Sequence, residues 1–276
     1  MIHGLEKSAS PIVASKPTNK AAREEQRGRT KGNAERLRMR RTQCRISVSQ
    51  QLDRVRQAAT RGEGRFTALL HHVSKDLLLL SFFWLKRKAA VGVDGVSWIE
   101  CEDHLEANLA DLLKRIHSNT YRVQPSRRQY IPKPDGQKQR PLGIAALGDK
   151  IAQRAIVTVL NAIYKLDFLG VSYGFRRFFD SISHDWLIRF LVHRIGDPRV
   201  INLIRKWLKA GVMEGGVLHP IEEGPPEWVV VSPLLANVFL HYVFDLWVNH
   251  WRKHQAHANF VVERRADDFV ADSKRA

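Results

Sequence analysis

The chain has 276 residues, with 45 Lys and Arg against 28 Asp and Glu, so its formal net charge is +17 at pH 7. Because 44% of the residues are hydrophobic, the chain can bury a core, which excludes disorder along its whole length. Two cysteines without disulfide or zinc spacing, and no apolar run near the roughly 20 residues that span a bilayer, favour a cytoplasmic protein without a membrane partner. The positive charge is typical of a protein that binds nucleic acid.

Residues 1–60 carry about half of this excess charge, with 14 Lys and Arg against 5 Asp and Glu, a net charge of +9. The segment is poor in aromatic residues and rich in Arg, Gln, Ser and Ala. We expect a basic, largely flexible N-terminal arm with one short helix near residues 45–59. Its charge suits an arm that binds phosphate groups, and it equally suits a solvated tail without a partner.

The next part of the chain has the pattern of a globular protein. Apolar residues at helical spacing predict helices within residues 66–88 and over residues 105–117. Between them, the glycines of residues 91–95 (VGVDG) predict a tight turn. Two short strands are expected at residues 129–132 and 140–144, joined by a Lys-Pro-Asp-Gly turn.

Helices dominate the second half. Asp149 is expected to cap a helix that runs through Leu166. Further helices and two terminal strands are expected in this order: helices at residues 184–195, 199–210 and 234–253, then strands at residues 259–266 and 269–272. Helices outnumber strands, so the expected fold class is α+β.

Asp267 and Asp268 form the first candidate site, at the turn between the two terminal strands. Adjacent carboxylates repel each other, so such a pair is stable in water or on a divalent cation. Aspartate is common in turns for local reasons, and this simpler explanation outweighs a metal site when the pair is considered alone.

Two cations and three histidines are weaker candidates. Lys133 and Arg140 flank the predicted hairpin turn and could bind a triphosphate, but two solvated charges at a loop are the favoured explanation when the pair is considered alone. His250 and His254 share a helix face with His257 nearby, a spacing that a metal could use, but a solvated face is the better-supported interpretation.

Seven short motifs occur in the order seen in group II intron reverse transcriptase/maturases, particularly the bacterial ones, and the resemblance covers roughly residues 66–272. The motifs are residues 91–96 (VGVDGV), 130–144 (YIPKPDGQKQRPLGI), 149–151 (DKI), 172–176 (SYGFR), 178–182 (FFDSI), 232–237 (SPLLAN) and 266–269 (ADDF). Each is weak alone, but their common order leaves little room for coincidence. The resemblance implies a right-hand polymerase fold, with fingers in residues 61–148 and a partial palm on a small antiparallel sheet in residues 149–276.

The same resemblance implies an RNA-directed DNA polymerase, which adds dNTPs to a primer on an RNA template. The chemistry is two-metal nucleotidyl transfer with Mg²⁺. Asp267 and Asp268 match the catalytic, metal-binding aspartates of the family. Lys133 and Arg140 match the residues that hold the triphosphate, and Phe179 matches the bulky residue that crowds the sugar 2′ position.

The chain departs from the family at several positions. In the family, several dozen residues separate the Tyr-Gly-Phe-Arg motif from the Phe-Phe-Asp motif, whereas here residues 173–176 are followed almost directly by residues 178–180. Gly174 stands where the first metal-binding aspartate is expected. The family's Pro-Gln-Gly turn reads Pro-Glu-Trp at residues 226–228, and Arg265 replaces a tyrosine. The chain ends eight residues after Asp268, before the expected thumb and maturase domain. We therefore expect no polymerase activity from this chain alone; the alternatives are a non-catalytic RNA-binding protein and a decayed fragment that folds poorly.

Overall fold

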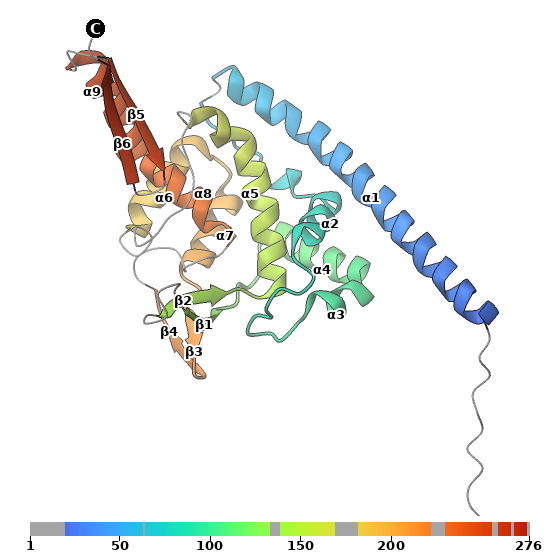
Figure 1. Cartoon of the computed structure of the whole chain (residues 1–276). Coiled ribbons are helices and arrows are strands. Elements are labelled where there is room, and N and C mark those ends of the chain that lie inside the picture. Colours follow the sequence, from blue (N-terminus) through green and yellow to red (C-terminus); the bar gives the residue numbers. More distant parts are fainter. Residues whose placement is uncertain are drawn as a thin grey trace, which may run out of the picture. The chain divides into compact units, whose positions relative to one another are not determined.

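The computed structural model describes residues 20–62, 64–132, 139–168, 182–221, 230–255, 259–265 and 268–274 (Figure 1). The chain divides into two units, residues 1–42 and residues 43–276. Helix α1 (Lys20–Thr60) begins in the first unit and ends in the second. The helix predicted near residues 45–59 is confirmed, but α1 is much longer than expected. The low aromatic content had been interpreted as flexibility, whereas Arg, Ala, Glu and Gln are good helix formers and no proline interrupts this segment.

The last part of α1 contributes to the core of the second unit. Its buried stripe recurs every three or four residues and consists of Cys44, Val48, Leu52, Val55 and Ala59. Asp76 fixes this stretch, because its carboxylate accepts hydrogen bonds from Ser47 Oγ at 3.0 Å and Cys44 Sγ at 3.7 Å. Residues 43–60, which were expected in the basic arm, therefore pack with the globular part. The division of the chain into an arm, a fingers region and a partial palm, with boundaries after residues 60 and 148, stays a prediction.

Short helices precede the first sheet: η1 (Leu70–His72), α2 (Lys75–Trp84), α3 (Trp98–Asp103) and α4 (Leu105–His117). The helix predicted over residues 105–117 is confirmed as α4. The long apolar stretch in residues 66–88 contains η1 and α2 instead of one helix. It is interrupted at Ser74, whose side chain accepts a hydrogen bond from Leu77 N at 3.2 Å and so caps α2.

A four-stranded sheet has the order β2-β1-β3-β4. The two expected strands are confirmed as β1 (Ser126–Pro132) and β2 (Gln139–Ile144), an antiparallel pair. β3 (Val212–Glu214) and β4 (Val217–His219) were not predicted, and β3 runs parallel to β1. The sheet is therefore mixed where the sequence had suggested an antiparallel one. The parallel pair is possible because a long helical connection separates β1 from β3.

The remaining elements follow the predicted order: α5 (Leu147–Asp167), α6 (His184–Arg194), α7 (Pro198–Leu208), α8 (Ser232–Leu240), the π-helical segment η3 (His241–Asp245), α9 (Leu246–His254), and the antiparallel strands β5 (Asn259–Arg265) and β6 (Asp268–Lys274). The predicted cap is wrong. Ala146 is the N-cap of α5, and Asp149 lies inside its first turn.

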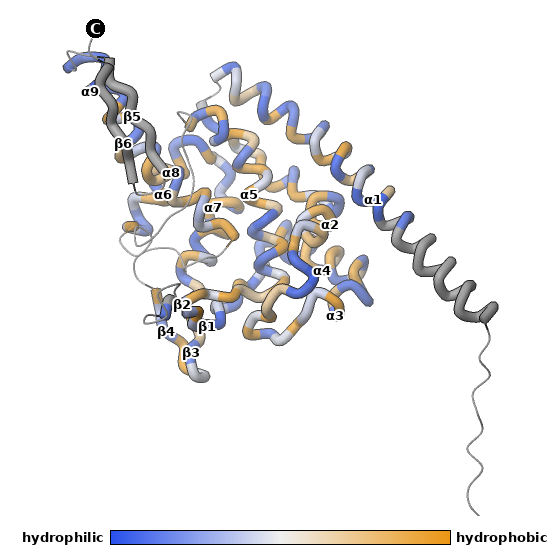
Figure 2. Tube along the Cα trace, in the orientation of Figure 1, coloured by the Kyte–Doolittle hydropathy of each residue, from blue (hydrophilic) through white to orange (hydrophobic). Residues whose placement is uncertain are grey.

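Helix α5 carries much of the core of the second unit, and apolar residues follow it and α2 in Figure 2. It packs against α2 and α8 and buries Ile156, Leu160 and Ile163 completely or almost completely. These elements confirm the α+β class, with helices dominant and two small sheets, one of four strands and one of two. Across the described residues, the helices are too short or too polar to cross a membrane.

Candidate nucleic-acid interface

The VGVDG loop packs directly on the start of α5. Gly92 is buried, and a Cβ atom built there would lie 2.5 Å from Ala146 Cα and 2.8 Å from the carbonyl oxygen of Ala145. Asp94 Oδ1 accepts a hydrogen bond from Val96 N at 3.3 Å, and Gly95 has a φ of +68°. The predicted tight turn is confirmed, and its first glycine is required because two backbone segments touch there.

Two cations hold this loop in place. Lys150 Nζ donates to the carbonyl oxygen of Ala90 at 2.7 Å. Arg127 donates to that of Val91 through Nε at 3.1 Å and Nη2 at 2.9 Å. Burial lowers the pKa of Lys150. Because Arg127 lies in β1 and Lys150 in α5, the loop, the hairpin and the helix form one connected scaffold.

Asp149 is the buried polar centre of this scaffold, with 1% of its surface exposed. Its Oδ1 accepts hydrogen bonds from Tyr121 Oη at 2.8 Å and Trp207 Nε1 at 3.1 Å, and its Oδ2 accepts one from Gln124 N at 3.1 Å. Burial raises the pKa of Asp149, although these hydrogen bonds oppose the shift. Sequence reasoning missed this role, because the partners from α7 and from the segment before β1 are distant along the chain.

The structure places the predicted site residues only in part. Arg140 lies in β2 opposite Ile131, and Asp268 begins β6, opposite Arg265. These two positions belong to different sheets. The structure describes the backbone of Arg140 and Asp268 but not their side chains. Several further residues lie entirely outside the described part of the chain: Lys133, Gly174, Phe179, Asp267 and residues 226–228. The roles of all five site residues stay predictions.

The histidine candidates are consistent with a solvated helix face. His250 and His254 are exposed, with ring centroids 4.3 Å apart, and His257 lies outside the described residues. Among the side chains that the structure describes, no group of three or more His, Cys, Asp or Glu could hold a metal ion.

The donor set of the implied Mg²⁺ site is incomplete in the sequence. The resemblance implies a first aspartate together with Asp267 and Asp268, but Gly174 at the first position has no side-chain oxygen. Two adjacent carboxylates remain, and these residues do not fit a site for two metal ions.

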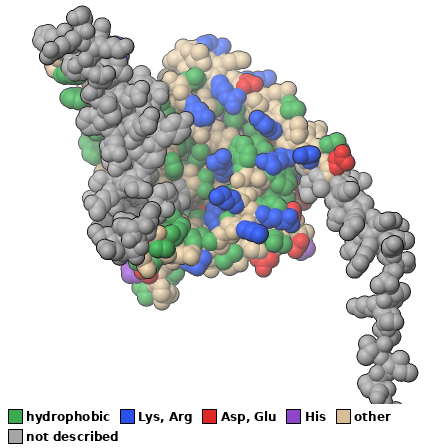
Figure 3. All heavy atoms as spheres, viewed as in Figure 1, with side chains coloured by type: hydrophobic (Ala, Val, Ile, Leu, Met, Phe, Trp, Pro, Cys, Tyr) green, Lys and Arg blue, Asp and Glu red, His purple; other side chains and the backbone are tan. Residues whose placement is uncertain are grey.

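Basic side chains spread over the middle of the face seen in Figure 3, whereas most acidic ones lie toward its edges. Two half-exposed or exposed tryptophans each contact an arginine. Arg154 Cζ lies 4.7 Å from the ring centroid of Trp84, and Arg189 Cζ lies 4.8 Å from that of Trp186. Cations beside exposed aromatic rings are typical of surfaces that bind single-stranded nucleic acid.

Several known proteins are similar to this chain, although no family model matches it. It is 34% identical over 191 residues to Protein YkfC of Escherichia coli K12, an alignment that covers 57% of this chain and 50% of that protein. It is 30% identical over 205 residues to group II intron-encoded protein LtrA of Lactococcus lactis subsp. cremoris, covering 64% of this chain and 34% of LtrA. The chain thus spans half the length of the first relative and about a third of the second.

Two further matches point to intron proteins and to one solved complex. An uncharacterized 91 kDa protein in the cob intron of Schizosaccharomyces pombe is 31% identical over 206 residues, which cover 64% of this chain and 25% of that protein. Among solved structures, a chain of a partial Cas6-RT-Cas1–Cas2 complex matches with a TM-score of 0.47 and 20% identity, covering 72% of this chain and 37% of that one. The sequence matches show that this chain is homologous to group II intron-encoded proteins, in agreement with the resemblance that its motifs indicate.

Proposed function

We propose that this chain is an RNA-binding protein of the group II intron reverse transcriptase type that does not carry out DNA synthesis by itself. The observation that carries the proposal is the contrast between its two halves. The described parts of the motifs in residues 91–151 form a connected scaffold for the hairpin that carries Arg140, whereas Gly174 stands where the family has a metal-binding aspartate. In this proposal the chain binds template RNA in the cytoplasm. Primer DNA, dNTP and Mg²⁺ would take part only in the DNA synthesis that the related reverse transcriptases carry out.

The magnitude of the loss supports inactivity. Metal ions supply several kcal/mol of transition-state stabilisation in this class of reaction, and each ~1.4 kcal/mol changes the rate tenfold. Removing a carboxylate that both metal ions need therefore costs several orders of magnitude in rate. The remaining pair, Asp267 and Asp268, cannot replace an oxygen donor at Gly174.

The first prediction concerns primer extension. The purified chain, given a primed RNA template, dNTPs and Mg²⁺, is expected to produce no detectable extension on a denaturing gel. An active reverse transcriptase on the same template serves as the positive control. Extension that disappears in the Asp267→Ala variant would show that the palm is catalytic and would overturn the inactive assignment.

The second prediction concerns RNA binding, which the basic surface supports whether or not catalysis survives. If about four phosphates are neutralised, affinity for a single-stranded RNA is expected to fall about 50-fold between about 50 and 200 mM salt. Fluorescence anisotropy across that range measures the slope. Affinity that is independent of salt, or no binding at low salt, would contradict the proposal.

A pair of variants locates part of this surface. Lys86 and Lys88 are exposed after α2, so their joint replacement by Gln is expected to reduce the salt slope. Lys75 already pairs with Glu106, and Lys75→Gln is the matched control that should leave the slope close to the wild-type value. Equal slopes for all three proteins would exclude Lys86 and Lys88 from the interface.

The buried core of the second unit argues against the alternative of a decayed fragment that folds poorly. Trp207, Tyr164 and Phe82 are among its largest side chains, and each is at most 2% exposed. A core of this kind supports cooperative unfolding, which circular dichroism during a thermal melt would detect.

A further inference from the structure

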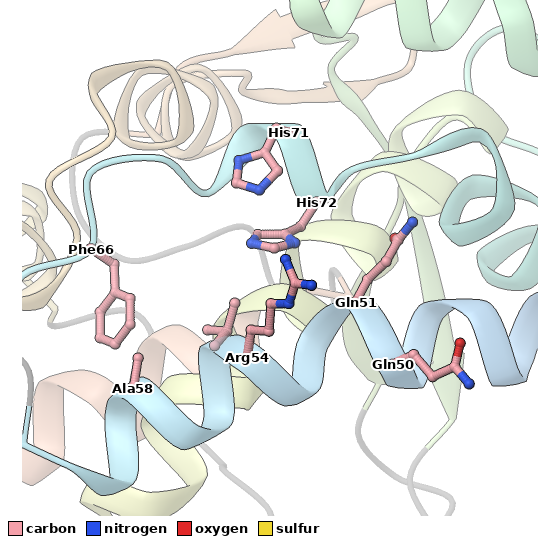
Figure 4. Close-up of a pocket in the computed structure, with 8 residues that line it drawn as sticks. Gln50, Gln51, Arg54, Ala58, Phe66, His71 and His72 are labelled. Atoms are coloured by element: carbon pink, nitrogen blue, oxygen red, sulfur yellow. The ribbon is translucent and has the colours of Figure 1, made fainter.

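A pocket of about 570 Å³ lies between residues 50–58 of α1 and the segment at residues 66–72 (Figure 4). Its volume falls within the range of about 300–1,000 Å³ typical of sites that bind small ligands. None of the described residues that line it is Asp or Glu, whereas Arg54 and two histidines do line it. The pocket therefore suits a neutral or anionic ligand rather than a cation.

One end of the pocket combines a cation with two aromatic rings. The ring centroids of His71 and His72 lie 3.8 Å apart, and Figure 4 shows the guanidinium of Arg54 directed toward His72. Burial, with a smaller contribution from His71, lowers the pKa of His72 to about 4, so this imidazole is neutral near pH 7. Within the described part of the chain, Arg54 forms no hydrogen bond or ion pair, so its donors are available to a ligand.

The other end of the pocket is apolar. Figure 4 shows Phe66 there, beside Ala58 of α1 and separated from the two imidazoles. The half-buried Phe66 ring contacts Arg194, whose Cζ lies 5.5 Å from its centroid, and its position is fixed by the backbone bond from Phe66 N to the carbonyl oxygen of Arg194 at 2.9 Å. Val55, Gln50 and Gln51 complete the lining, and the amide oxygen of Gln51 accepts a long hydrogen bond of 3.5 Å from Ser74 Oγ.

We propose that this pocket binds one unpaired nucleotide of a single-stranded RNA, with its base against the imidazoles of His71 and His72 and its phosphate at Arg54. Aromatic rings stack on bases, amides bind base edges, and a guanidinium binds phosphate through two parallel hydrogen bonds. A base inside a duplex cannot enter, because its faces and its pairing edge are already occupied. This inference rests on the proposed RNA binding and adds a preference for unpaired nucleotides.

The third prediction compares two RNAs at fixed salt, a fluorescent oligoadenylate strand and a blunt-ended, fully paired RNA duplex of equal charge. The Arg54→Gln and His72→Ala variants are expected to bind the single strand about tenfold more weakly, a loss typical of one stacked base. The matched control is Arg56→Gln, since Arg56 lies on the same helix, is exposed and pairs with Asp53. Arg56→Gln should bind the single strand almost as well as the wild type, and the affinity for the paired duplex should change little in all three variants.

The outcomes separate the two proposals. If the wild-type protein binds neither RNA at low salt, the proposed RNA binding is wrong. If it binds both RNAs and the pocket variants match Arg56→Gln on both, only the pocket assignment is wrong. A measurement on the wild-type protein avoids any folding defect of the variants: the ring resonances of His71 and His72 are expected to shift when the oligoadenylate is added, and unchanged resonances at saturation would also overturn the pocket.

Discussion

Replacing Asp197 with alanine is expected to destabilise the protein by about 3–5 kcal/mol, because buried backbone donors then lose their acceptor. The carboxylate is 0% exposed. Its Oδ2 accepts hydrogen bonds from Leu69 N at 3.0 Å and Leu70 N at 2.9 Å, and its Oδ1 accepts one from Arg199 N at 3.1 Å. One side chain therefore caps α7 and also fixes the start of η1. Urea unfolding followed by circular dichroism measures the loss.

Arg199→Ala is the matched control for this prediction. The guanidinium of Arg199 contacts Asp197 at 3.3 Å, but the arginine side chain is 45% exposed, so the ion pair is worth less than about 1 kcal/mol. The alanine variant at Arg199 keeps its own backbone N–H and all backbone bonds to the carboxylate. Equal losses from the two variants would mean that the ion pair, and not the backbone capping, stabilises this junction.

The pH dependence of stability follows from the same contacts. Burial raises the pKa of Asp197, but the hydrogen bonds from Leu70, Arg199 and Leu69 together lower it further, so the net pKa is below the ordinary value of 3.8. A carboxyl with a lowered pKa stabilises the folded state above its unfolded pKa, and this contribution is lost as the pH falls through the folded pKa. Asp197→Asn should therefore weaken the decline of stability below about pH 4.

Local patterns predicted several elements between residues 100 and 260 well, although not the long helix α1. Leucines at helical spacing identified α4 with its bounds, and the strands predicted on either side of the Lys-Pro-Asp-Gly sequence are β1 and β2, while that sequence itself lies outside the described residues. Two shorter features had local signals that were overlooked. Ser97 and Glu100 form a capping box at the start of α3, and Gly215 and Gly216, both with positive φ, form the two-residue turn between β3 and β4.

Other features could not be predicted from local sequence, because their partners are distant. The apolar stretch in residues 66–88 looked like one helix, but Asp197 binds the amides of Leu69 and Leu70 from 128 and 127 residues away. The pocket at His71 and His72 likewise exists only where α1 packs beside this segment. The sequence identified the positive charge and the family motifs, whereas the roles of the buried carboxylates Asp149 and Asp197 became visible only in the tertiary structure.

Replacing Asp149 with alanine is expected to cost about 3 kcal/mol or more, because it leaves Tyr121 Oη, Trp207 Nε1 and Gln124 N without their acceptor in a buried site. Asp149→Asn is the informative variant to compare with Asp149→Ala. Tyr121 and Trp207 both donate to Oδ1, so an asparagine oxygen can retain both bonds and only the bond from Gln124 is lost. The asparagine variant should therefore lose less than half as much stability at pH 7.

The pH dependence distinguishes this carboxylate from Asp197, because burial raises the pKa of Asp149 instead of lowering it. A carboxyl with a raised pKa binds its proton more tightly in the folded state, so it destabilises the protein increasingly as the pH rises from its ordinary value of 3.8 through its folded value. Relative to wild type, Asp149→Asn should gain stability as the pH rises above 3.8 through this interval, whereas Asp197→Asn should lose stability as the pH rises toward 3.8 from below. Urea unfolding of both variants between about pH 3 and pH 7 tests the opposite signs. Slopes of the same sign would mean that the hydrogen bonds to Asp149 outweigh its burial, so that its carboxylate would stabilise the hairpin scaffold as an ion.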